Sequence, residues 1–133
     1  MATWYVIGPT GAGAQTGVNP ANAWPSIRNI AGTAAGDEIL CTGSETFPGG
    51  TFHNLLSSRT YRGCDAAWTP GAAQYTITST PATATSILRI GGGGGPYAVH
   101  NFTLTGSAGA TTQLISSFGP GLATGVRFYD CII

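Results

Sequence analysis

The side chains most able to perform chemistry in this sequence are its carboxylates, and they are few. Only five occur in 133 residues: Asp37, Glu38, Glu45, Asp65 and Asp130. Glycoside hydrolysis needs two carboxyl groups that flank the scissile bond. Asp37 and Glu38 are adjacent, so a strand would point them to opposite faces, and the other three acids stand far apart in the sequence. We therefore expect no catalytic residues and a protein that is not an enzyme.

Metal and cofactor chemistry has little support either. His53 and His100 are the only histidines, and neither has a cysteine or a carboxylate at a metal-ligand spacing. The glycine-rich segment 8–17 lacks the last glycine of a dinucleotide-binding loop, because Thr16 occupies that position. The chain contains no lysine, which excludes P-loop and Schiff-base chemistry. We expect no bound metal and no cofactor.

The charge pattern excludes another group of partners. Five basic residues, all arginines scattered along the chain, balance five acids. Nucleic acids and anionic membranes attract clustered basic residues, and no apolar run approaches the ~20 residues that span a bilayer. We expect no nucleic-acid partner and no membrane. Cys41, Cys64 and Cys131 fit neither a disulfide framework nor a zinc spacing, so we expect free thiols.

Aromatic rings are the remaining resource for binding. Tyr61 and Trp68 flank Gly63 and are our candidates for stacking on a sugar ring, because an aromatic face offers a flat apolar surface. The alternative is that Trp68 joins Trp4 and Trp24 in closing one end of the fold. A glycan-binding role therefore stays open beside a structural one.

The elements that would position these residues are almost all strands. A helix is expected only over 23–31, and short runs rich in Thr, Ile, Val, Phe and Tyr predict strands elsewhere. The expected strands are 38–42, 75–80, 86–90, 99–105, 112–117 and 126–133. Ile77 and Phe102 are 25 residues apart, as are Ile90 and Ile115, and Phe102 and Phe128 are 26 apart. Such a repeat predicts a solenoid with at least two strands per turn, and an antiparallel sandwich is the alternative.

Several motifs resemble those of a known family. They are Thr-Trp-Tyr-Val-Ile-Gly-Pro-Thr-Gly at 3–11, the segment 17–27 with its Pro-Ala-Asn-Ala-Trp-Pro-Ser-Ile, Ala-Gly-Asp-Glu-Ile-Leu at 35–40, Glu-Thr-Phe-Pro-Gly-Gly at 45–50, Thr-Tyr-Arg-Gly-Cys-Asp-Ala-Ala-Trp at 60–68, and Val-His-Asn-Phe-Thr-Leu-Thr-Gly at 99–106. Together they resemble the right-handed parallel β-helix proteins of the pectate-lyase-like superfamily. That superfamily includes polysaccharide lyases, glycoside hydrolases, surface adhesins and phage tail spikes, so the resemblance specifies a fold and no activity.

The resemblance implies an all-β fold, a short right-handed parallel β-helix of about four to five turns with an N-terminal cap that contains a short helix. We expect a single domain over 1–133, in which 1–36 forms the strand, loop and helical cap and 37–133 forms the coils. Small residues have a role in such a coil, because glycine suits its corners and Thr, Val and Ile stack well in ladders.

The last expected strand, 126–133, points to a function. A parallel coil must hide its terminal edge, because an open row of backbone donors and acceptors over an apolar core invites association. We expect this edge to be covered by a partner, unless the chain is a fragment of a longer coil. The residues expected at the interface are Val126, Phe128, Tyr129, Ile132 and Ile133.

These features together predict a non-enzymatic structural subunit of a virus particle. The resemblance to phage spike and decoration proteins implies a capsid decoration (cement) protein or a tail-fibre protein. The expected partners are further copies of the chain, in a trimer, or a larger virion protein. The first residues carry no secretion signal, so we expect synthesis in the host cytoplasm and a location in the virion, with an extracellular surface as the alternative.

The alternative function is a carbohydrate-binding or carbohydrate-cleaving β-helix that contacts a surface glycan. In that case Asp65 and Asp130 would be the acids to test, and Trp68 the ring that holds the sugar.

Overall fold

The described part of the chain is all-β with almost no helix. The computed structural model describes residues 1–48, 51–80, 87–91, 96–106, 115–118 and 125–133. The strands are β1 Thr3–Gly8, β2 Glu38–Phe47, β3 His53–Leu55, β4 Thr60–Cys64, β5 Tyr75–Ser79, β6 Leu88–Gly91, β7 Tyr97–His100, β8 Phe102–Thr105, β9 Ile115–Phe118 and β10 Val126–Tyr129. Two short 3-10 turns, η1 Pro20–Asn22 and η2 Ile27–Asn29, complete the elements.

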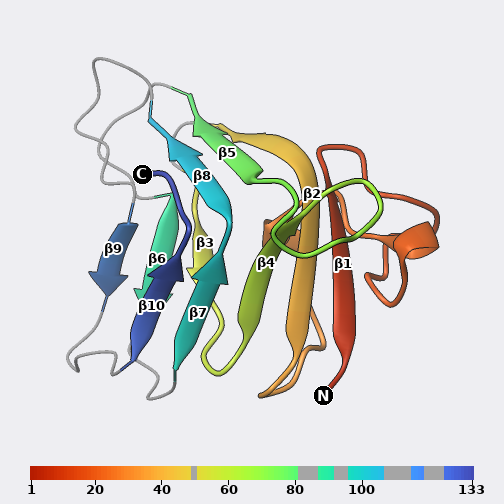
Figure 1. The fold of residues 1–133 in the computed structure, drawn as a ribbon, viewed down its shortest axis with the longest axis horizontal. Helices are drawn as coiled ribbons and strands as arrows, with labels where there is room; N and C mark the ends of the chain where they lie inside the picture. The colour runs from red at the N-terminus through yellow and green to blue at the C-terminus, as the bar shows by residue number, and fades with distance from the viewer. Residues whose placement is uncertain (49–50, 81–86, 92–95, 107–114, 119–124) are drawn as a thin grey trace.

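The strands form three parallel ladders. The first ladder runs β1-β2-β4-β7-β10, the second runs β2-β5-β8 and the third runs β3-β6-β9. The described strands enter the ladders in the same order on successive passes, and the sheet curls around an interior (Figure 1). This arrangement is compatible with a parallel β-helix-like fold.

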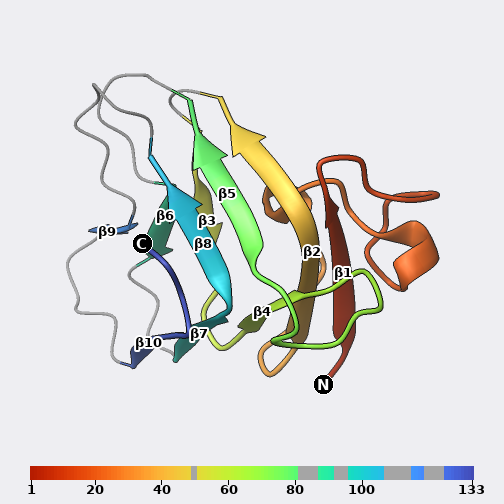
Figure 2. The same ribbon diagram turned by 45° about the horizontal axis from the view of Figure 1, so that its top comes forward.

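The corner between the first and second ladders lies within β2. Its first half pairs with β4 and its second half pairs with β5, so one strand serves two ladders (Figure 2). Gly43 lies between the two halves and has a φ of 86°, a backbone conformation that residues other than glycine rarely adopt. A Cβ at this position would also collide with the backbone oxygen of Gly8 on the neighbouring strand. The corner therefore requires glycine.

The register differs from the repeat that the sequence suggests. Tyr75 pairs with Phe102 and Leu88 with Ile115, each pair 27 residues apart, whereas the sequence spacing suggests 25. Phe128 pairs with Val99 in the first ladder and is not a partner of Phe102. Side chains alternate between the two faces of a strand with a period of two. A register error of two residues therefore leaves each apolar residue on the same face, and the apolar pattern of the sequence does not reveal it.

The predicted helix over 23–31 is not formed. Only Ile27–Asn29 makes a 3-10 turn, and the Ser26 hydroxyl caps it by accepting the Arg28 N–H. Trp24 is instead extended and bridges to Val6 of β1. Pro25 disfavours a helical conformation at the residue before it, which accounts for the extended backbone.

Two other expectations lie partly outside the described residues. They are the strands predicted over 86–90 and 112–117, of which Ser86 and residues 112–114 are not described, whereas Leu88–Gly91 is observed as β6 and Ile115–Phe118 as β9.

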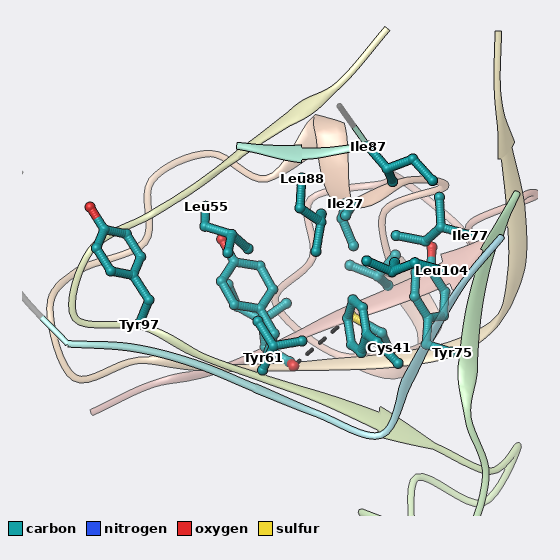
Figure 3. Packing of buried hydrophobic residues seen from close by; sticks show 14 of the residues in the cluster. Ile27, Cys41, Leu55, Tyr61, Tyr75, Ile77, Ile87, Leu88, Tyr97 and Leu104 are labelled. Carbon is teal, nitrogen blue, oxygen red and sulfur yellow. Dashed lines mark hydrogen bonds between the residues drawn. The ribbon is translucent and has the colours of Figure 1, made fainter. Parts of the chain in front are cut away.

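The core fills the space between the ladders. Alternate residues of each strand point inward, as the burial of Tyr75, Ile77 and Ser79 in β5 illustrates. Figure 3 shows side chains from all three ladders meeting in this interior. The labelled members of the cluster are Ile27, Cys41, Leu55, Tyr61, Tyr75, Ile77, Ile87, Leu88, Tyr97 and Leu104.

Candidate functional site

The two edge strands of the first ladder, β1 and β10, differ in how the rest of the chain covers them. At the β1 end, the segment 17–24 runs along the outer edge of the strand. The Tyr5 N–H donates to the Gly17 carbonyl at 2.9 Å, the Trp24 N–H donates to Tyr5 at 3.0 Å, and the Ile7 N–H donates to Trp24 at 2.9 Å. The Trp24 ring stacks on Trp4 with centroids 5.3 Å apart. The chain itself therefore covers its β1 edge.

At the other end, β10 is paired on one side only among the described residues. The Tyr97 N–H donates to the Gly125 carbonyl at 3.1 Å, and the Asn101 N–H donates to the Tyr129 carbonyl at 3.0 Å. Carbonyls alternate in direction along a strand, so the backbone groups of Val126 and Phe128 point away from β7. No described residue pairs with these groups, which form an open edge at the end of the ladder opposite to β1 (Figure 1).

The structure brings the five predicted interface residues to this one edge. Val126 and Phe128 are half-buried and pack against the core. Tyr129, Ile132 and Ile133 are 38%, 61% and 60% exposed. We call Val126–Ile133 the β10 edge.

Beyond β10, the chain begins to cover the second ladder. The Leu104 N–H donates to the Ile132 carbonyl and the Ile132 N–H donates to Phe102, both at 2.9 Å. Ile132 thus lies over β8 as the start of a further layer, although its side chain stays exposed. The open edge therefore extends over parts of two ladders.

The outward face of the first ladder carries a row of large side chains in register. This outer row consists of Tyr5, Leu40, Arg62, His100 and Tyr129. The Tyr129 ring stacks on His100 with centroids 4.4 Å apart and an interplanar angle of 13°. Burial and the neighbouring Arg62 guanidinium lower the pKa of His100. The His100 ring that stacks on Tyr129 is therefore neutral at neutral pH.

The loop 65–74 lies over the same outward face. Figure 1 shows it crossing in front of β2 toward β1, and the Trp68 ring meets Tyr5 edge-on with centroids 4.9 Å apart. Asp65 shapes this loop, because its Oδ1 accepts the N–H groups of Ala67 at 3.0 Å and Thr69 at 2.9 Å. Trp68 is half-exposed and lies outside the coil, away from the Trp4–Trp24 stack.

The two sugar-stacking candidates lie on opposite faces of the sheet. Tyr61 is 1% exposed and points into the core, so its ring presents no face to a sugar. The Leu56 N–H donates to its hydroxyl, and His53 Nε2 lies 3.1 Å from the same oxygen. Of the two candidates, only Trp68 is at the surface.

Sequence reasoning missed the two polar pairs buried inside the coil. Besides His53 and Tyr61, the Tyr75 hydroxyl donates to Glu45 Oε1 at 2.6 Å. Burial, with a smaller effect of the Arg28 charge, lowers the pKa of His53 to about 4. Burial likewise raises the pKa of Tyr75. Glu45 and Tyr75 are 30 residues apart, so no short-range spacing of residues in the sequence indicates the contact.

Two further acids, Asp37 and Glu38, have structural partners. Asp37 accepts hydrogen bonds from the Ala34 N–H at 2.8 Å, the Ala2 N–H at 2.7 Å and the Trp4 indole at 2.8 Å, and these lower its pKa to about 2. It thereby joins the start of β1 to the start of β2. Glu38 forms an ion pair with Arg62 at 2.6 Å.

In comparisons with known proteins, no family model, curated protein or solved structure matches this chain.

Within the described ranges, no three His, Cys, Asp or Glu side chains gather as a metal site. In the same ranges, no helix is long and apolar enough to cross a membrane. The three cysteines are free, with Cys41 and Cys64 buried. The function therefore has to be inferred from the chain's own geometry.

Proposed function

We propose that this protein is a non-enzymatic structural subunit that assembles through its β10 edge. The observation that carries the proposal is the contrast between the two ends of the first ladder. The β1 edge is closed by residues 17–24, whereas β10 presents outward backbone groups beside exposed isoleucines. An open strand edge is a template for a further strand, and apolar side chains next to it gain free energy when they are covered.

The finer fold proposal is a right-handed parallel β-helix of about four to five turns, related to the pectate-lyase-like superfamily. The order in which the chain enters the three ladders supports it. The strong preference of parallel crossover connections for the right hand supports the handedness.

A virus particle is the assembly that we propose, with the chain as a phage capsid decoration or tail-fibre protein made in the host cytoplasm. The motif resemblance supports this choice. So does the composition, since 8% charged residues and no lysine suit a surface that partners cover. Further copies of the chain or a larger virion protein would be the partners.

The test compares charge insertion at the two ends of the ladder. Ile132→Lys/Ile133→Lys places two charges at the open edge, and Val18→Lys is the matched control because Val18 is 53% exposed beside the closed edge. Sedimentation velocity should show the wild type as an oligomer of the 13.5 kDa chain. The double variant should be monomeric and Val18→Lys should remain oligomeric. A wild type that stays monomeric at high micromolar concentration contradicts the proposal.

A glycan-binding role is a second candidate, supported by the half-exposed Trp68 beside Tyr5 on the outward face. Trp68→Ala should abolish retention on a glycan array while leaving the circular dichroism spectrum unchanged, because the ring lies outside the core. If the protein also cleaved a glycan, Asp65→Asn or Asp130→Asn should remove the activity. Absence of glycan retention in the wild type eliminates this candidate.

A further inference from the structure

We infer that the β10 edge binds the β10 edge of a second copy of this chain, antiparallel, about a two-fold axis at Phe128. The inference rests on the proposed assembly function and names the partner. It follows from which edges are free, from the direction of the backbone groups and from the charges along β10.

The closed β1 edge excludes the head-to-tail arrangement. Adding β10 of one copy to β1 of the next would require the hydrogen bonds from Tyr5 and Ile7 to the segment 17–24 to break. Among the described edges of the first ladder, the one that remains on a second copy is its own β10 edge. A contact between identical edges is isologous and has a two-fold axis.

Backbone direction sets which residues can meet. Val126 and Phe128 carry the outward groups, because Gly125 and Tyr129 use their carbonyls toward β7. Of the antiparallel registers that keep inward residues opposite inward residues, two pair three residues of β10 with those of the second copy. In one, Phe128 faces Phe128 of the second copy at the axis. In the other, Arg127 faces Arg127 of the second copy.

Charge selects the first register. Arg127 is exposed on the outward face, and in the second register two guanidinium groups would lie directly opposite each other in a close pair, which is unfavourable. With Phe128 at the axis, Arg127 instead lies opposite Tyr129 of the second copy. Arg127 Nη1 already lies 3.3 Å from Tyr129 Oη within one chain, which shows that the two side chains are compatible neighbours. Asp130 follows Tyr129, so its negative charge would approach the arginine of the other copy.

The apolar side chains complete the match. Phe128 and Val126 pack against the core of their own chain, so the axis would join two cores through two phenylalanine rings. The exposed Ile132 and Ile133 flank the strand in each copy. One β10 edge pairs with one other β10 edge, and this uses up the edge of both copies. The geometry therefore favours a dimer over the trimer that we expect from the sequence.

The test uses disulfide formation between surface positions, so that folding of the core is not at issue. Arg127→Cys and Tyr129→Cys are made separately in a Cys131→Ser background, and both side chains are exposed. Directly opposite residues that do not exchange hydrogen bonds have Cα atoms about 4.5 Å apart, within reach of a disulfide. After mild oxidation, an equal mixture of the two variants should give about tenfold more cross-linked dimer than either variant alone.

The possible outcomes separate the inference from the proposed function. Cross-linking of Arg127→Cys with itself would establish the other register and overturn the placement of the axis. An oligomer in sedimentation velocity without cross-linking in the mixture would overturn the two-fold pairing and leave the assembly function in place. A monomeric wild type would overturn both. A dimeric mass together with cross-linking only in the mixture supports the inference.

Discussion

Acidification should weaken the fold through one buried histidine, His53. This ring is 7% exposed and lies 3.1 Å from the Tyr61 hydroxyl, so the folded chain accepts a proton there only at low pH. Its pKa is about 4 in the folded chain, against an ordinary value of 6.5. Because the folded pKa is the lower one, the unfolded chain takes up the proton first. Stability is therefore full above about pH 6.5 and falls toward pH 4, by roughly 3 kcal/mol in total.

Urea unfolding between pH 7.5 and 4.5 measures this effect. The His53→Gln variant keeps a polar group near Tyr61 and cannot titrate, so its free energy of unfolding should vary with pH less than that of the wild type, by roughly 2 to 3 kcal/mol over the range. His100→Gln is the control, since His100 is partly exposed and should change the profile less. Identical pH profiles for the wild type and His53→Gln would refute the reasoning.

Three further tests concern the buried Glu45–Tyr75 pair, the Asp37 hydrogen bonds and the glycine at the corner. Tyr75→Phe removes the hydroxyl donor to buried Glu45 and should destabilise the fold by about 1–3 kcal/mol in urea unfolding, and a double-mutant cycle with Glu45→Gln should show that the two effects are coupled. Asp37→Asn should lower the melting temperature at pH 7. Since the pKa of Asp37 is about 2, the wild type should lose this advantage between about pH 4 and pH 2, and equal melting temperatures at pH 7 would contradict the role. At Gly36 the positive φ is the only source of strain for a side chain, so Gly36→Ala should lower the free energy of unfolding by about 1–2 kcal/mol. At Gly43 the new Cβ would also collide with the β1 backbone, so Gly43→Ala should lower it further in the same assay.

The strand pattern predicted the all-β fold, and the structure shows parallel pairing throughout its named ladders. Register was not predictable, because insertions such as the loop 65–74 lengthen some passes and leave others short. Leu40 pairs with Arg62 after 22 residues, whereas Arg62 pairs with His100 after 38. A single sequence offers no way to tell a lengthened loop from a changed repeat.

A strand at the C-terminal end was predictable from the apolar pattern at 126–133, but it is observed only over Val126–Tyr129, because the chain turns at Asp130 with a φ of 50°. Whether a given side chain faces the core was harder to predict. Tyr61 and Trp68 both flank Gly63 in the sequence, but Tyr61 lies in the strand on its inward face and Trp68 lies in the loop outside. The buried pair of Glu45 and Tyr75 joins β2 to β5, a contact that exists only once the ladders stack.

The placement of the tryptophans decides which parts of the molecule a fluorescence experiment can observe. All three belong to the β1 side, with Trp4 and Trp24 stacked under the closed edge and Trp68 against Tyr5. In a stack of strands, each layer depends on its neighbours, so an isolated chain should unravel first from the uncovered β10 side. Early loss of β10 and β7 would thus leave tryptophan emission unchanged. Amide hydrogen exchange at Tyr97 and Asn101, whose N–H groups donate to the Gly125 and Tyr129 carbonyls, would detect it.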